Sequence, residues 1–151
     1  MTDQEHILSF LRTNGPSTPG KVAKVINSQI LLASAHLSDL SSQGKVKVSH
    51  LKAGGTPLYY LPGQESQLFK FASSNLNPKD YQVLLRLQAQ KVLREKELEL
   101  LAKVALRQLH DFAIPLQVTV DGQAELFWKW HLNPLEETNK IIEGMLRPTS
   151  P

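Results

Sequence analysis

Four side chains in the second half of the chain have the types and spacing needed to contact DNA. They are Lys96, Lys103, Arg107 and His110, separated by seven, four and three residues. On one continuous α-helix, with about 100° between successive residues, they share a sector of roughly 60°. Arginine can donate two hydrogen bonds to a guanine edge, and lysine suits phosphate. We therefore expect base contacts from Arg107, with an ordinary solvated basic face as the alternative.

A second group of cations lies in the first half, in the stretch "KVKVSHLKAGGTPLYYL". Its Gly-Gly pair and flanking β-formers predict a hairpin. Alternation along the first strand turns Val46 and Val48 inward and places Lys45 and Lys47 on the outer side. Lys52 lies beside the turn, and it is the side chain that we most expect on a phosphate. The three lysines of this predicted hairpin are thus candidate contacts for a nucleic-acid backbone.

The helix before each hairpin must position these groups, and the two helices differ. The first is predicted to expose Leu31, Leu32 and Asp39 and to carry no Lys or Arg on that face, which favours a protein contact over a DNA groove. Its expected buried residues are Ile30, Ala33, Leu37 and Leu40. Those expected for the second helix are Leu98, Leu101, Ala102, Ala105 and Leu109.

The aromatic strand "LFWKWHL" invites a base-stacking interpretation. Alternation places Trp128 and Trp130 on one side, where we expect them in the core because "LYYL" in the first half has a similar aromatic enrichment. Phe127 and Lys129 fall on the other side, and the alternative is that they form an exposed patch for a partner.

Catalytic chemistry is not indicated. The chain has no cysteine, which excludes disulfides, thiolate zinc sites and cysteine nucleophiles. The five histidines lack the spacing of metal ligands, and there is no Gly-rich phosphate loop, nucleophile elbow or paired-carboxylate signature. We expect no enzyme activity, no metal and no cofactor.

Composition describes a modest globular protein of 151 residues with 41% hydrophobic residues and a net charge of +3. No apolar run approaches the ~18 residues of a membrane span, and the N-terminus lacks the features of a signal peptide. We expect a cytoplasmic protein without a membrane span, associated with the nucleoid if it binds DNA.

The turn and helix-capping residues along the chain indicate two units with the same order of elements. In the first, a helix ends at Asn14-Gly15, Thr18-Pro19 opens a second helix, and a third precedes the hairpin. "LASAHLSDL" in this unit lines up with "LAKVALRQL" in the second, whose hairpin turns at Asp121-Gly122. "REKELE" is taken as an abbreviated second helix.

Four segments follow from this organisation: a first domain at residues 1–63, a partly helical linker at 64–77, a second domain at 78–133, and a C-terminal helix with a tail at 134–151. The last helix is expected to dock on the body or on a second subunit through four apolar residues, Leu135, Ile141, Ile142 and Leu146.

The segment from Glu5 to Pro62 resembles the winged helix-turn-helix superfamily, particularly its MarR-like and ArsR-like regulators. The residues that carry the resemblance are Val22, Val25, Leu37, Leu40, Gly44, Val46, Val48 and the Gly54-Gly55 turn. It implies an α+β fold of two small winged-helix units, each with three helices and a hairpin wing, followed by a C-terminal helix. In such proteins the third helix enters the major groove and the wing contacts phosphate.

Two functions remain open at this point. The first is a DNA-binding protein, a transcriptional regulator or chromosome-associated protein, with double-stranded DNA as partner and a homodimer formed through the terminal helices, as in MarR-like proteins. The second is a non-enzymatic scaffold with a protein partner at Leu31 and Leu32. Tandem winged helices also resemble the small subunit of the ESCRT-II complex, the segregation and condensation protein B family and winged-helix subunits of the basal transcription machinery.

Overall fold

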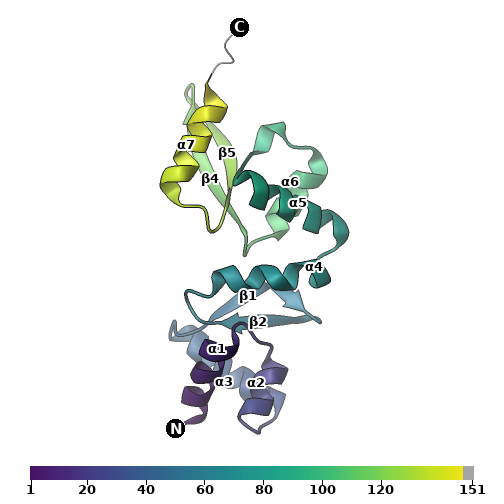
Figure 1. Ribbon diagram of the computed structural model, residues 1–151, viewed down its shortest axis with the longest axis vertical. Helices are drawn as coiled ribbons and strands as arrows, with labels where there is room; N and C mark the ends of the chain where they lie inside the picture. Colours follow the sequence, from purple (N-terminus) through teal and green to yellow (C-terminus); the bar gives the residue numbers. More distant parts are fainter. Residues whose placement is uncertain (148–151) are drawn as a thin grey trace. The chain divides into compact units, whose positions relative to one another are not determined.

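The computed structural model describes residues 1–147 and confirms a mixed α+β fold. Within these residues the chain forms seven α-helices, two 3-10 helices and two small antiparallel sheets (Figure 1). They divide into two compact units, the first from Met1 to Leu76 and the second from Asn77 onward. Residues 148–151, which belong to the predicted tail, lie outside the described residues.

The first unit consists of three helices followed by a hairpin. The helices are α1 (Asp3–Asn14), α2 (Pro19–Val25) and α3 (Ile30–Ser42), and the strands are β1 (Lys47–Ala53) and β2 (Thr56–Tyr60). Local sequence sets the helix ends. Thr2 and Glu5 form a capping box on α1, which ends at Gly15 with φ 85°, and Thr18 caps α2 with Pro19 as its first residue.

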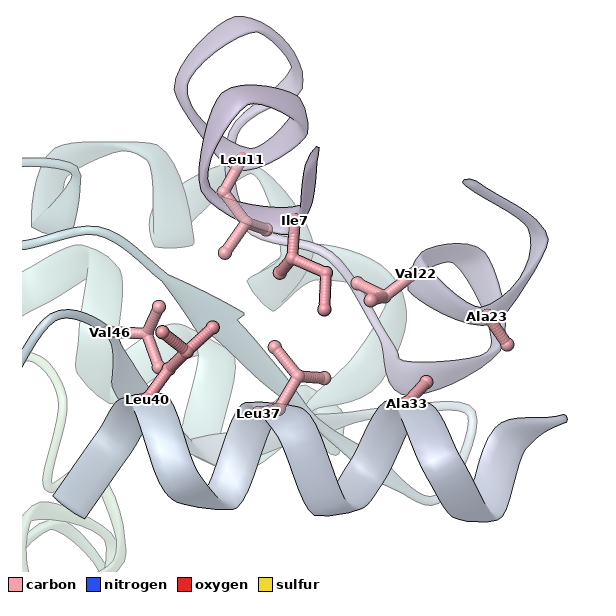
Figure 2. Packing of buried hydrophobic residues seen from close by; sticks show 8 residues of the cluster. All are labelled: Ile7, Leu11, Val22, Ala23, Ala33, Leu37, Leu40 and Val46. Carbon is pink, nitrogen blue, oxygen red and sulfur yellow. The ribbon is translucent and has the colours of Figure 1, made fainter. Parts of the chain in front are cut away.

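The core of this unit joins the three helices and the start of the hairpin. Eight buried residues make up the cluster in Figure 2: Ile7, Leu11, Val22, Ala23, Ala33, Leu37, Leu40 and Val46. Ala33, Leu37 and Leu40 confirm most of the expected buried stripe of α3. Ile30 does not, because it is the first residue of the helix and is exposed.

The expected alternation along the first hairpin strand is interrupted. Val48 is exposed although Val46, just before β1, is buried, so Val48 does not face inward as predicted. Beyond Val48, the register between β1 and β2 shifts before Lys52. Where the register shifts, the buried hydroxyl of Ser49 bonds to the backbone. It accepts a hydrogen bond from Leu58 N at 2.9 Å and donates one to Leu51 O at 2.5 Å. A polar side chain thus replaces a missing backbone bond.

The segment expected as a linker, residues 64–77, lies almost entirely in the first unit. It forms a 3-10 helix, η1 (Glu65–Phe71), and a short helix, α4 (Ala72–Asn75), with Leu68 and Ala72 buried. In Figure 1 this segment runs along the hairpin on the side away from α1 and α3. Asn75 Oδ1 accepts a hydrogen bond from Gly54 N at 3.3 Å, so the hairpin turn is held by this segment.

The second unit has a comparable order of elements. It contains α5 (Pro78–Gln90), β3 (Val92–Arg94), the 3-10 helix η2 (Glu95–Glu97), α6 (Leu100–Gln108), β4 (Ala113–Val120), β5 (Gln123–Trp130) and α7 (Leu135–Leu146). The three strands form an antiparallel sheet in the order β3-β5-β4. The "REKELE" stretch is therefore not an α-helix: it supplies the end of β3 and one 3-10 turn.

The two tryptophans of β5 are buried, which confirms their predicted place in the core. Trp130 stacks on Phe112 with ring centroids 6.0 Å apart. Phe127 and Lys129 do not form the exposed patch considered as the alternative, because Phe127 is fully buried. The Lys129 ammonium donates to the carbonyl oxygens of three residues, Trp130, His131 and Asn133. Burial lowers the pKa of Lys129.

Helix α7 covers the face of the sheet that carries Phe127. Ile142 is buried against Val92 and Phe127, and Ile141, Met145 and Leu146 are partly buried there. The helix thus docks on the body of its own unit, although Leu135 stays exposed. Among residues 1–147, no helix is both long and apolar enough to cross a bilayer.

Candidate functional site

The basic face expected on the second unit is not formed. Lys96 lies in η2, Leu98 and Glu99 are extended, and α6 begins only at Leu100. The four cations therefore do not share one continuous helix, and His110 follows the end of α6. The phase of the shorter helix also differs from the prediction, since Leu106 is buried and Leu101 is exposed.

Arg107, the expected base contact, is engaged inside its own unit. Its Nη1 lies 2.7 Å from Glu95 Oε1, and its guanidinium lies over the Trp128 ring at 5.6 Å from the centroid. Glu95 Oε2 also accepts a hydrogen bond from Trp128 Nε1 at 3.0 Å. Burial opposes ionisation of Glu95, but hydrogen bonds from Arg107 and Trp128 and the charges of Arg107 and Lys103 outweigh it and lower its pKa. Glu95 thus fastens η2 to α6 and β5.

Lys96 lies close to a carboxylate. Its Nζ is 3.8 Å from Glu125 Oε2, and Glu125 accepts two hydrogen bonds from Arg94, at 2.8 and 2.7 Å. Lys103 is half-buried on α6, and its charge acts on Glu95. Lys96, Lys103 and Arg107 thus each lie near a carboxylate, which reduces their attraction for phosphate.

The hairpin cations of the first unit are in different situations. Lys47 Nζ lies 3.0 Å from Glu65 Oε1. Lys45 is exposed near Asp39, whose pKa is lowered mainly by hydrogen bonds from Gln4 and Gln43. Lys52 is exposed beside the turn, as expected.

The most distinctive surface feature is a pair of exposed leucines at the start of α3 and another at the start of α6. Leu31 and Leu100 are each 76% exposed, and Leu32 and Leu101 are each 52% exposed. We call them the first leucine pair (Leu31 and Leu32) and the second leucine pair (Leu100 and Leu101). The exposure expected for the first pair is confirmed, whereas the second pair was not expected.

The two pairs occupy the same position relative to the buried side of their helices. Each pair is followed by a fully buried alanine, Ala33 or Ala102. The next buried leucines, at four and seven residues beyond that alanine, are Leu37 and Leu40 in α3 and Leu106 and Leu109 at the end of α6. The similarity of "LLASAHLSDL" and "LLAKVALRQL" was the sequence signal for the second pair.

Other exposed apolar side chains adjoin each pair along the sequence. Ile30 precedes the first pair and is exposed, and Val104 lies one turn after Leu100 and is exposed. A shallow hollow beside the first pair is lined by Ala23, Asn27, Ser28, Gln29 and Leu32. Ile30 and Val104 thus add one exposed apolar side chain to the surface of each pair, and apolar side chains exposed together can mark a contact with a partner.

The net charge is unequally divided. The first unit, residues 1–76, has seven Lys and Arg against four Asp and Glu, whereas the rest of the chain has ten of each. The excess of +3 therefore belongs to the first unit, and not to the unit with the expected basic face.

Known proteins do not supply a function. No family model matches the chain, and no curated protein matches it. Within residues 1–147, no group of three His, Asp or Glu side chains is placed to hold a metal ion.

Proposed function

We propose that both units are winged-helix units and arose from one duplicated unit. Their element order and strand pairing support this. In the first unit, Ser17 follows the first helix and pairs with Tyr59 of β2 through hydrogen bonds of 3.0 and 2.8 Å. In the second, β3 follows the first helix and pairs with β5. In both, the segment after the first helix pairs with the last strand of the hairpin. The second unit has η2 where the first has α2.

The function that we propose is a non-enzymatic protein-interaction adaptor of the cytoplasm, with a contact surface on each unit. The observation that carries it is the equal exposure of the two leucine pairs at equivalent helix positions. Neighbouring positions on these helices differ, with Ser34 against Lys103 and Ser38 against Arg107. The leucines are the same, which indicates a shared use of this surface.

The expected energy of such contacts is sufficient for binding. Complete burial of a leucine side chain contributes about 1.5–3 kcal/mol. A pair that is half to three-quarters exposed therefore offers roughly 2–4 kcal/mol before the costs of association, which place the net gain lower. One pair supports a weak contact, and two pairs engaged by linked segments of one partner support a tighter one.

Nucleic-acid binding is a second candidate, and one observation favours it: the whole charge excess lies in the first unit. Lys45 and Lys52 of that unit are exposed on the hairpin side. DNA binding through the second unit is less well supported because Glu95 and Glu125 lie against Arg107 and Lys96.

The adaptor proposal is tested with variants that add a charge to each pair. Leu31→Asp/Leu32→Asp and Leu100→Asp/Leu101→Asp are compared with Leu135→Asp, a matched control on α7 with similar exposure. Partners captured with the wild-type chain are identified, purified and titrated against all variants. The proposal expects the complex to weaken at least tenfold for one or both pair variants and to be unchanged for the control.

Protein stability provides the second measurement. Circular dichroism should show that the pair variants unfold at nearly the same temperature as the wild type, because the leucines are already half to three-quarters exposed. The adaptor proposal is abandoned if the identified complex is equally tight with both pair variants.

A further inference from the structure

The first leucine pair lies within a stretch of the sequence whose only formal charges are positive. From residue 16 to residue 38, the only charged Lys, Arg, Asp or Glu residues are Lys21 and Lys24, both on α2 and both exposed. They are three residues apart and so lie on neighbouring positions of the helix surface. Neither lysine has an ion pair within residues 1–147.

The lysines and the apolar residues belong to adjoining helix faces. A Cβ placed on Gly20 would lie 4.0 Å from Ile30 Cδ1, so this side of α2 meets the first turn of α3. Ala23 and Lys24 follow Gly20 by three and four residues and therefore lie on the same side of α2. Ala23 also lines the hollow beside Leu32. Lys24 directly follows this lining residue on the same side of α2, and Lys21 lies one turn before it.

We propose that the first leucine pair binds an acidic amphipathic helix of a partner protein, with its apolar face on Ile30, Leu31 and Leu32 and its carboxylates toward Lys21 and Lys24. This rests on the proposed adaptor function and names the partner of one of its two surfaces. The argument is complementarity: exposed aliphatic side chains gain from apolar contact, and two unpaired ammonium groups gain from carboxylates at the rim.

The other occupants fit less well. Nucleic acid would bring phosphates to the lysines but would leave three aliphatic side chains without an apolar contact. A second copy of this chain could offer its second leucine pair, but the charges around that pair are mixed. Glu99 there lies 3.1 Å from Arg86, Glu97 lies 3.6 Å from Arg94, and Lys103 is on the same helix. That surface therefore does not present an acidic rim.

Two fluorescein-labelled peptides serve as probes, both designed as amphipathic helices with the same leucine face. One carries glutamates on its flanks and the other carries lysines. Anisotropy titrations use the full chain at low and moderate salt. The glutamate peptide should bind at least tenfold more tightly than the lysine peptide, and the difference should shrink as salt rises because exposed charges are screened. Equal binding of the two peptides would refute the inference.

Charge reversal supplies the sharper test. Lys21→Glu/Lys24→Glu should weaken binding of the glutamate peptide about tenfold and should strengthen binding of the lysine peptide. Leu31→Asp/Leu32→Asp should abolish binding of both peptides. Leu135→Asp, the control on α7 with a similarly exposed leucine, should change neither. Loss of binding only with Leu100→Asp/Leu101→Asp would assign the peptide to the second unit and overturn the inference.

Two further outcomes reassign the surface. Displacement of the glutamate peptide by an equimolar random DNA duplex would make nucleic acid the ligand. If sedimentation shows a dimer that dissociates with Leu31→Asp/Leu32→Asp, the occupant of this surface is a second copy of the chain. Failure here is distinguishable from failure of the adaptor function. If an identified partner is lost with the leucine variants and kept with Lys21→Glu/Lys24→Glu, the adaptor stands and the acidic helix is wrong.

Discussion

Replacing Glu95 by alanine should destabilise the second unit through one carboxylate that joins three elements. Its Oε1 lies 2.7 Å from Arg107 Nη1 on α6, and its Oε2 lies 3.0 Å from Trp128 Nε1 on β5. The side chain itself is only 14% exposed. Without it, the indole N–H of a buried tryptophan loses its acceptor and η2 loses its attachment.

The expected cost follows from these two bonds. A buried donor left without a partner costs about 1–3 kcal/mol. The ion pair is worth less, about 0.2–1 kcal/mol, because half of the Arg107 side chain is in water. We expect Glu95→Ala to lower the free energy of unfolding by about 2–3 kcal/mol. Glu95→Gln keeps an acceptor for the indole and should cost about 1 kcal/mol.

Tryptophan fluorescence during urea unfolding measures this effect selectively. The chain has two tryptophans, Trp128 and Trp130, and both lie in the second unit. With a slope of about 1–3 kcal/mol per molar urea, the loss of about 2–3 kcal/mol in the alanine variant should shift the midpoint by about 0.7–3 M. The matched control is Glu97→Ala in the same 3-10 turn, which removes an exposed carboxylate 3.6 Å from Arg94. A shift no larger than that of the control would refute the anchoring role of Glu95.

The stability of the second unit should also depend on pH through Glu95. The pKa of Glu95 is lowered in the folded state, so folding favours the ionised form. The resulting stability is complete above the unfolded-state pKa of about 4.3 and is lost as the pH falls through the lower folded-state pKa. Between neutral pH and mildly acidic pH, the wild type and Glu95→Gln should therefore differ by a constant amount. The difference should shrink below about pH 4.

Three more changes are predicted. Ser49→Ala should lower the free energy of unfolding by about 1–3 kcal/mol, because it leaves the buried amide of Leu58 without its acceptor. Hydrogen exchange of that amide should accelerate, and unchanged exchange would contradict this prediction. Ile142→Ala should cost about 2–4 kcal/mol in urea melts followed by tryptophan fluorescence, since Ile142 packs on the sheet; a smaller loss would mean that α7 contributes little. If the first unit binds duplex DNA, Lys45→Glu/Lys52→Glu should weaken binding more than Lys103→Glu/Arg107→Glu, whereas the reverse order in an anisotropy titration would return the contact to the second unit.

Much of the local structure is predictable from short-range chemistry. Thr18-Pro19 and Asn77-Pro78 begin helices because a side-chain oxygen accepts from a first-turn amide and proline needs no amide partner there. Gly15 and the Asp121-Gly122 turn take positive φ angles, which glycine tolerates and aspartate accepts in tight turns. The exposure of Leu31 and Leu32 was predictable for a similar reason, because the periodicity of a long helix fixes which residues lie opposite its core.

The prediction of the basic face failed at a short segment whose conformation depends on distant residues. "REKELE" has helix-forming composition, and local propensity favours a helix there. Its first part instead pairs with β5 as the end of β3, and Glu95 turns toward Arg107 and Trp128. As a result, Lys96 lies outside α6, and Arg107 forms an ion pair with Glu95. The register shift between Val48 and Lys52 likewise involves a contact with the opposite strand, because the Ser49 hydroxyl accepts a hydrogen bond from Leu58 N.

The sequence by itself determined the helix ends, the turns, most of the buried positions and the exposure of the first leucine pair, because these follow from neighbours within a few residues. The tertiary structure decided which charges remain available and which apolar side chains remain uncovered. A lysine or arginine has the same attraction for phosphate in any sequence, but a carboxylate brought within 3 Å by folding removes most of it. Phe127 and Leu100 illustrate the same point for apolar residues: α7 covers Phe127, and among residues 1–147 nothing covers Leu100.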